Sequence, residues 1–378
     1  MKTVCVVTGT RAEYGILRPV MRAVEGSDSL SLQVIATGMH LDDERGRTID
    51  EIGRDGFRID ATVPLSPEGD APADMGRAVG RGIPDLIDTL ERLNPDVVLV
   101  LGDRTEPFAA AIATMFLGKC LAHVHGGDRS RGGFDESMRH AITKLAHVHF
   151  AATEKSAERI RRMGERPEHV HVVGAPGLDE ALAGPFRDPD QLGVDPSAPP
   201  IVVVQHPVST RPDDAGREMT ETMEAVVAED ATVIVVYPNN DPGGRRMIEV
   251  IRSYENRGNV TTFANIPRTD FLSLMKCAAV LVGNSSSGMI EAASFRLPVV
   301  NVGERQVGRE RSGNVIDVPA EREAIASAIH KALRDKDFRQ RLATLENPYG
   351  DGHASARIVK VLEELDINHD LIQKQIAY

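Results

Sequence analysis

Side chains that can exchange protons occur at or just after the ends of several short apolar runs in this 378-residue sequence. They are Asp103, His125, Asp128, Asp135 and His206. Aspartate and histidine act as general acids and bases when partial burial moves their pKa values toward neutrality. Capping of a turn or a helix is an equally good interpretation of a single residue such as Asp103. As a group, these side chains predict proton-transfer chemistry in a cleft.

A second set of residues has the chemistry of a phosphate site. Ser285 and Ser286 lie in the glycine-containing segment 283–288 and lead into an expected helix at 289–293, where backbone N–H groups and hydroxyls would be exposed. Arg11, Arg104 and Arg305 also follow apolar runs, and each guanidinium offers a fork of donors to phosphate. Plain N-capping by one serine and a surface salt bridge for any one arginine are the alternatives. Taken together, the loops predict a site for a phosphate-bearing small molecule.

No cofactor and no metal ion are expected. The loop Gly9-Thr10-Arg11 lacks the G-x-G-x-x-G pattern of dinucleotide-binding folds, which disfavours NAD. The pairs His123/His125 and His147/His149 share strand faces, but neither pair has a third closely spaced ligand, so we expect His123, His147 and His149 to be structural. The cysteines lie far apart in or beside apolar stretches and are expected to be small buried hydrophobes: Cys5, Cys120 and Cys277.

Composition narrows the class of ligand. The chain has 44 Lys and Arg against 56 Asp and Glu, a net charge of -12, so it lacks the basic surface that binds a nucleic-acid backbone. No apolar run approaches the roughly 20 residues that cross a bilayer, and Met1-Lys2 leads directly into an expected strand. We therefore expect a cytoplasmic protein with a small-molecule ligand.

The elements that position these residues follow an alternating pattern. Short runs rich in Val and Ile alternate with segments of helical period, which indicates βα units around parallel sheets. The expected strands are 4–8, 32–37, 97–101, 121–125, 148–152 and 169–173, then 201–204, 232–236, 260–263, 280–282, 299–302 and 315–318. Helices are expected at 17–24, 83–93 and 354–372. Because ligands bind beyond the carboxyl ends of parallel strands, the polar loops would converge there.

Proline-rich segments around 185–200 separate the two groups of strands. The fold class we predict is α/β, with two doubly wound Rossmann-like domains and a cleft between them. The expected domains are 1–185, which carries most of the carboxylates, and 186–353, which binds the phosphate group. Residues 354–378 would form a helix that packs back on the first domain.

The motifs, in their order and spacing, resemble those of the hydrolysing UDP-N-acetylglucosamine 2-epimerases of sialic-acid-type pathways over nearly the whole chain. The motifs are 9–15 (GTRAEYG), 102–104 (GDR), 135–144 (DESMRHAITK), 206–207 (HP), 237–241 (YPNND), 283–288 (GNSSSG) and 305–306 (RQ). The resemblance implies a glycosyltransferase-B-like fold and a homo-oligomer, either a dimer or a tetramer. It also implies a reaction: UDP and the C2 proton leave to give a glycal, and water then adds to give N-acetylmannosamine.

Residue roles are carried over from the resemblance. It implies UDP contacts from Arg11, Arg104, Asn239, Asn265, Ile266, Ser285, Ser286, Glu291 and Arg305. It implies catalytic roles for Asp103 and Asp135 and places His206 at the departing diphosphate. Some members carry a glutamate at the position of His125, whereas other branches have histidine, so the division of roles between His125 and Asp128 stays open.

Alternatives to this reading remain. The substrate could instead be a modified sugar nucleotide, such as a UDP-2,4-diacetamido-trideoxy sugar of the legionaminic acid pathway. A non-hydrolysing epimerase would keep UDP on the product, and a glycosyltransferase of the same fold would need an acceptor. A non-catalytic sugar-nucleotide sensor would not need Asp103 and Asp135.

Overall fold

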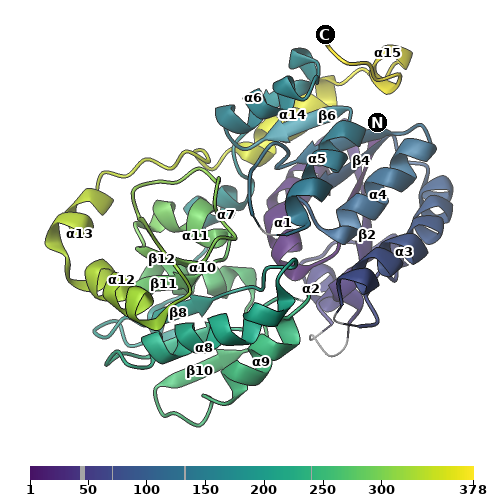
Figure 1. The fold of residues 1–378 in the computed structure, drawn as a ribbon. Helices are drawn as coiled ribbons and strands as arrows, with labels where there is room; N and C mark the ends of the chain where they lie inside the picture. Colours follow the sequence, from purple (N-terminus) through teal and green to yellow (C-terminus); the bar gives the residue numbers. More distant parts are fainter. Residues whose placement is uncertain (43–46, 70, 132, 240) are drawn as a thin grey trace. The chain divides into compact units, whose positions relative to one another are not determined.

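The computed structural model describes residues 1–42, 47–69, 71–131, 133–239 and 241–378 (Figure 1). The chain divides into two compact units. The first unit comprises Met1–Asp128, Asp135–Glu180 and Tyr349–Tyr378, and the second comprises Arg129–Phe134 and Ala181–Pro348. The carboxyl-terminal segment therefore returns to the unit in which the chain begins.

The first unit is built on a parallel sheet, which has seven strands within the described residues, in the order β3-β2-β1-β4-β5-β6-β7. The strands are β1 (Lys2–Thr8), β2 (Leu30–Thr37), β3 (Ala61–Val63), β4 (Val97–Leu101), β5 (Cys120–Val124), β6 (Val148–Ala151) and β7 (Val170–Val172). Every residue of β4 and β5 is buried, as expected for central strands of a parallel sheet that is covered on both faces.

Helices cover both faces of this sheet. Alternate residues of β1 face opposite ways: Val4 and Val6 pack with α1 (Arg11–Glu25) and α14 (Ala354–Glu364), whereas Cys5 and Val7 pack with α3 (Pro72–Leu93) and α4 (Thr105–Phe116). The other helical segments of this unit are η1 (Gly38–Leu41), α2 (Ile49–Arg54), α5 (Asp135–Leu145), α6 (Glu154–Arg162), η3 (Pro167–His169) and α7 (Gly177–Ala183). No helix in the part of the chain that the structure describes is long and apolar enough to span a bilayer.

The second unit repeats the plan, with six parallel strands among its described residues in the order β10-β9-β8-β11-β12-β13. They are β8 (Ile201–Val204), β9 (Val233–Val236), β10 (Val260–Phe263), β11 (Val280–Gly283), β12 (Val299–Val302) and β13 (Val315–Val318). Its helical segments are η4 (Pro189–Leu192), η5 (Pro212–Asp214), α8 (Ala215–Val226), α9 (Gly244–Arg252), α10 (Arg268–Cys277), α11 (Ser287–Ile290), η6 (Ala292–Phe295), α12 (Arg322–Arg334) and α13 (Lys336–Leu342). The predicted fold class, two doubly wound parallel-sheet domains, is confirmed.

Two expected helices differ from the observed ones. The helix expected at 289–293 is a single turn, α11, followed by the 3₁₀ turn η6, and Arg296 ends this segment in the left-handed conformation. The helix expected at 354–372 is two helices, α14 (Ala354–Glu364) and α15 (His369–Ile372). They separate because Leu365 adopts an extended conformation and the Asn368 side chain accepts the Leu371 N–H at 3.0 Å, which starts a new helix.

The carboxyl-terminal segment is fixed to the first unit by packing and by one lysine. Ile358 and Leu362 are fully buried in the α1 side of the core. Lys374 Nζ donates to the carbonyl oxygens of Lys144 (2.7 Å) and Ala146 (2.5 Å), at the end of α5, and pairs with Glu165 at 2.6 Å. A cation at this position satisfies the terminal carbonyl groups of α5.

Candidate active site

Three neighbouring strands of the first unit, β1, β4 and β5, end at one edge of the sheet, and the polar loops follow them there. Gly102 N–H donates to the Val124 carbonyl at 2.9 Å, and His125 N–H donates to the Phe150 carbonyl at 3.0 Å. These bonds extend the sheet by one residue beyond β4 and β5. His125 is consequently bonded to the sheet through its own backbone, and Asp103 directly follows a residue that is.

Asp103 is held by a side chain to which the sequence analysis gave no role. Arg139, in α5, is 1% exposed and forms ion pairs with Asp103 and with Glu136, the latter at 2.8 Å. It also donates to the Asp128 carbonyl at 3.0 Å. The ion pair with Arg139 fixes the orientation of the Asp103 carboxylate at the end of β4. Asp135, the first residue of the same helix, is buried.

His125 and Asp128 form a hydrogen-bonded dyad. His125 Nδ1 lies 3.1 Å from Asp128 Oδ2, and Asp128 Oδ1 accepts from Ser156 Oγ at 2.8 Å. An ionised Asp128 accepts from the Nδ1–H tautomer and leaves Nε2 of His125 as the proton acceptor. The backbone of His125 has φ 64°, a left-handed conformation that is rare for residues other than glycine. The geometry thus favours His125 as the proton-transfer group and Asp128 as its positioning partner.

Three other histidines of this unit, His123, His147 and His149, are buried. His123 Nε2 lies 2.8 Å from the Gly102 carbonyl, and burial lowers the pKa of His123 to about 3. Burial also lowers the pKa values of His147 and His149 to about 4, so all three are neutral at physiological pH. Among the described residues no group of three or more His, Cys, Asp or Glu side chains could hold a metal ion. Cys5 and Cys120 are buried in strands, and Cys277 is half-buried.

His206 in the second unit is held by three hydrogen bonds. The Asn239 N–H donates to His206 Nδ1 at 3.1 Å, the His206 N–H donates to Asn284 Oδ1 at 2.7 Å, and Asn284 Nδ2 donates to the His206 carbonyl at 2.9 Å. Because Nδ1 accepts a backbone N–H, the proton of the neutral ring is on Nε2. His206 therefore presents a hydrogen-bond donor, which suits a phosphate oxygen.

The predicted phosphate loop surrounds Asn284. Its carbonyl accepts from Arg305 at 3.3 Å and from Gln306 at 2.8 Å, and Ser285 Oγ accepts the Ser287 N–H at 3.3 Å. Gly283 has φ 128°, and a Cβ there would lie 2.2 Å from the Val204 carbonyl oxygen, so this turn requires glycine. The structure brings Ser285, Ser286 and Arg305 into one neighbourhood with His206 through this turn.

The other residues of the second unit that were predicted to bind UDP each have different neighbours or a different exposure. Glu291 pairs with Arg268 at 2.6 Å, with exposed fractions of 2% and 8%, and Arg268 belongs to none of the sequence motifs. Asn239 Nδ2 donates to Asp241 Oδ2 at 2.7 Å, while Asn240 of the same motif lies outside the described residues. Asn265 is exposed and Ile266 half-buried, in the loop between β10 and α10.

In the first unit, the two predicted arginines are engaged by glutamates. Arg11 Nε pairs with Glu51 at 2.6 Å, and Arg104 Nε lies 3.8 Å from Glu106 Oε2. Arg11 is in the first turn of α1, whose start is capped by Thr10, and Arg104 immediately precedes α4. Both guanidiniums are at the strand ends, as the sequence indicated.

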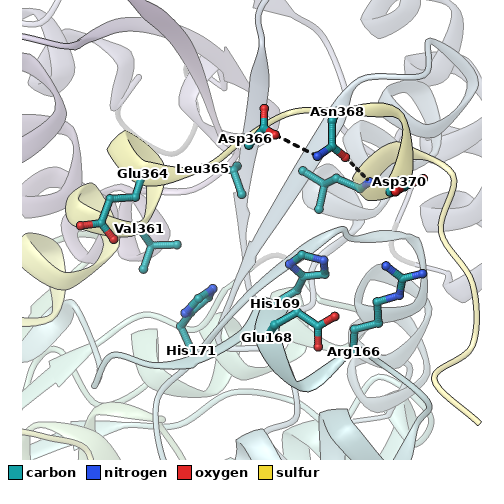
Figure 2. Close-up of a pocket in the computed structure, with 11 residues that line it drawn as sticks. Arg166, Glu168, His169, His171, Val361, Glu364, Leu365, Asp366, Asn368 and Asp370 are labelled. Atoms are coloured by element: carbon teal, nitrogen blue, oxygen red, sulfur yellow. Dashed lines mark hydrogen bonds between the residues drawn. The ribbon is translucent and has the colours of Figure 1, made fainter.

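A cavity of about 370 Å³ lies elsewhere in the first unit. It is lined by Arg166, Glu168, His169, His171, Val361, Glu364, Leu365, Asp366, Asn368, Asp370 and Leu371. Figure 2 shows Asn368 between Asp366, to which it donates at 2.9 Å, and the first turn of α15. None of the predicted catalytic or substrate-binding residues lines this cavity, so the chemistry argued from the strand ends does not belong to it.

Comparisons with known proteins find similarity to 2-epimerases of UDP-sugars. Residues 22–363 match the family described as UDP-N-acetylglucosamine 2-epimerase. The UDP-N,N'-diacetylbacillosamine 2-epimerase (hydrolyzing) of Legionella pneumophila is 39% identical over all of both chains. The UDP-N-acetylglucosamine 2-epimerase of Neisseria meningitidis serogroup B is 31% identical over 88% of each chain.

Solved structures share the fold. A crystal structure of UDP-GlcNAc 2-epimerase from Neisseria meningitidis bound to UDP-GlcNAc matches with a TM-score of 0.82 at 22% identity, covering 97% of this chain and 100% of that one. A crystal structure of the Methanocaldococcus jannaschii UDP-GlcNAc 2-epimerase in complex with UDP-GlcNAc and UDP matches with a TM-score of 0.78 at 22% identity, covering 96% of this chain and 100% of that one.

Proposed function

Because the chain belongs to the UDP-N-acetylglucosamine 2-epimerase family, we propose that it is a hydrolysing 2-epimerase of UDP-N,N'-diacetylbacillosamine. The observation that carries the proposal is the 39% identity over the full length of both chains to a relative of that name. A Campylobacter jejuni relative named GDP/UDP-N,N'-diacetylbacillosamine 2-epimerase (hydrolyzing), 30% identical over 90% of this chain, supports the same substrate class.

The proposed reaction has two steps. In the first, the bond between C1 and the diphosphate oxygen breaks, a base takes the C2 proton, and the electron pair forms a C1=C2 double bond. In the second, water adds across this bond: its oxygen goes to C1 and a proton returns to the opposite face of C2. The products are UDP and the free 2-epimeric sugar.

The first unit supplies the proton-transfer groups. Departure of the diphosphate leads the first step, because the C2 proton is a weak acid until positive charge develops at the ring. Asp103, held in place by Arg139, and the dyad of His125 with Asp128 are suited to exchange protons at C2 and with water. Asp135 is the second carboxylate that we assign to this chemistry.

The second unit binds the leaving group. His206 donates through Nε2 to a diphosphate oxygen, and Ser285, Ser286 and Arg305 add hydroxyl and guanidinium donors. These donors stabilise negative charge that grows as UDP departs, so they accelerate the step. Glu291, fixed by Arg268, accepts from hydroxyls of the nucleotide.

UDP-N-acetylglucosamine is the second candidate substrate, which the 31% identical Neisseria relative supports. The two sugars differ at C4 and C6, where the diacetamido sugar has an acetamido group and a methyl group. The predicted cytoplasmic location and homo-oligomeric assembly stay predictions.

The test is to incubate the protein with each UDP-sugar in deuterated water and identify the released sugar by NMR. We expect free UDP and deuterium at C2 of the product. We also expect a kcat/KM at least about tenfold higher for the diacetamido substrate, because UDP-N-acetylglucosamine lacks the groups at C4 and C6 that the pocket would contact. Release of an epimer still attached to UDP would refute hydrolysis. Turnover without deuterium at C2 would refute elimination, and a preference for UDP-N-acetylglucosamine would reverse the order of substrates.

A further inference from the structure

Two buried glutamates, Glu13 and Glu106, lie next to Gly9, two residues before Arg11. The Gly9 N–H donates to Glu13 Oε2 at 2.7 Å. Glu106, in α4, occupies the space next to the same glycine, since a Cβ at Gly9 would lie 2.5 Å from Glu106 Cγ. A Cβ at Gly38 would lie 2.3 Å from Glu106 Oε1. Glu13 is 4% exposed and Glu106 1%, so both carboxyl groups are inside the protein.

The charges around these two carboxyl groups do not balance if both are ionised. From the loop before α4, Arg104 Nε lies 3.8 Å from Glu106 Oε2, which also accepts from Thr105 Oγ1 at 2.9 Å. Arg11, in the first turn of α1, pairs with Glu51. The guanidinium of Arg104 thus faces two buried carboxyl groups, and burial of an uncompensated carboxylate is strongly unfavourable.

From η1, His40 faces the same region and is neutral. Its ring nitrogens lie 3.0 Å from Thr8 Oγ1 and 2.8 Å from Thr48 Oγ1, and burial lowers the pKa of His40 to about 4. His40 therefore adds no positive charge at physiological pH. Burial, followed by the charge of Glu106, raises the pKa of Glu13 to about 8.

The two carboxyl oxygens of Glu13 differ in their hydrogen-bond partners, which indicates which of them would carry a proton. Glu13 Oε2 accepts the Gly9 N–H, whereas Oε1 is buried and has no hydrogen-bond partner among the described residues. A proton on Oε1 neutralises one carboxyl group and leaves Glu106 as the single negative charge opposite Arg104. The hydrogen bond of Oε2 to Gly9 is kept in this state.

We propose that Glu13 and Glu106 together hold one proton, and that this proton positions the loops of Arg11 and Arg104 to receive the substrate diphosphate. The role of the two arginines in this inference rests on the proposed function; the shared proton does not. When the proton is lost, two adjacent buried negative charges repel each other, and the Gly9 loop, which is bonded to one of them, is displaced. Glu13 and Glu106 are positioning residues in this arrangement.

The shared proton is tested by thermal unfolding of the full chain between pH 5.5 and 9. Glu13 has a higher pKa in the folded chain than in the unfolded one, so folding takes up a proton between the two values and stability falls as pH rises toward about 8. We expect the Tm of E13Q to gain several degrees relative to wild type across this range. E106Q should behave in the same way, because the remaining carboxylate then faces Arg104 alone.

E25Q is the matched control, since Glu25 is in the same helix but is 48% exposed and paired with Arg22. Its Tm should follow that of wild type at every pH. Parallel curves for wild type and both E13Q and E106Q would overturn the shared proton. If E13Q does not fold, the pH dependence of the Tm of E106Q alone tests whether the proton is shared.

The positioning role is tested by calorimetry of UDP binding at pH 7 and pH 9. One pH unit above the pKa of Glu13, which is about 8, we expect the affinity of wild type and E25Q to fall by up to about tenfold, while E13Q and E106Q show no such fall. A Tm difference that is present as expected, together with a wild-type UDP affinity that is the same at pH 7 and pH 9, would refute positioning. If wild type binds no UDP at either pH, the proposed function fails, and the Tm curves still decide whether the proton is shared.

Discussion

Replacing Arg139 with methionine should damage both the fold and the chemistry, because one buried guanidinium binds three oxygen-bearing groups. It pairs with Asp103 and Glu136 and donates to the Asp128 carbonyl. Methionine fills a similar volume but carries no charge. Asp103, which is 18% exposed, would then lose its counter-ion.

The size of the effect follows from this burial. Removing one partner of a fully buried pair costs about 3–5 kcal/mol, and the partial exposure of Asp103 places R139M near the lower end, about 3 kcal/mol. A misplaced base lowers kcat by roughly 100-fold. Because Arg139 is not among the groups assigned to the nucleotide, KM should change by less than about threefold.

A double-mutant cycle with D103N isolates the pair. Chemical unfolding of R139M, D103N and the double variant should give a coupling energy of at least about 2 kcal/mol, since the double variant removes both charges of the Asp103–Arg139 pair and the loss of the Glu136 contact is common to R139M and the double variant. R162M is the matched control: Arg162 pairs with Glu158 at 2.8 Å but is 77% exposed, so its loss should cost less than about 1 kcal/mol. Additive effects of R139M and D103N, within about 0.5 kcal/mol, would refute the reasoning.

Three further outcomes are expected. Gly9→Ala places a methyl group 2.5 Å from a buried side chain and should lower stability by about 1–3 kcal/mol in chemical unfolding, whereas Gly53→Ala, which meets nothing within 4 Å, should not be destabilised. The pair S285A and R305M should raise KM with little change in stability; an unchanged KM would place the diphosphate elsewhere. H206Q should lower kcat in steady-state assays while UDP still binds, and a wild-type kcat would contradict the donor role of the ring.

Much of the fold was predictable from apolar runs. Val97–Leu101, Ile201–Val204 and Val315–Val318 are strands with the bounds the sequence indicated. The first two are buried along their whole length, because their apolar residues fill both faces of a covered parallel sheet, whereas the third is an edge strand. Ala61–Val63 was missed, since three residues of mixed character form no recognisable run. The break between α14 and α15 was missed because the apolar period continues through it, while the Asn368 cap acts locally.

The candidate site was predictable as a set of residues but not as a set of partners. Asp103 and Arg139 are separated by 36 positions in the sequence. Their ion pair forms because the end of β4 and the helix α5 lie next to each other in the fold, which no local sequence pattern shows. The contact of His125 with Asp128 spans three positions, and the sequence left their roles open because it does not show which ring nitrogen is bound. Glu13 was quoted within a motif, but its burial next to Glu106 appears only in three dimensions.

The lysine that satisfies the last carbonyl groups of α5 joins two distant parts of the chain into one cooperative folding unit. Fraying of α5, the helix that carries Asp135 and Arg139, at its carboxyl end therefore requires the hydrogen bonds of Lys374 to break. Amide hydrogens near residues 144–147 should therefore exchange with solvent at the same rate as those flanking Lys374. A ligand that orders the beginning of α5 would slow both, and mass spectrometry of deuterium uptake would report occupancy of the site from the last residues of the chain.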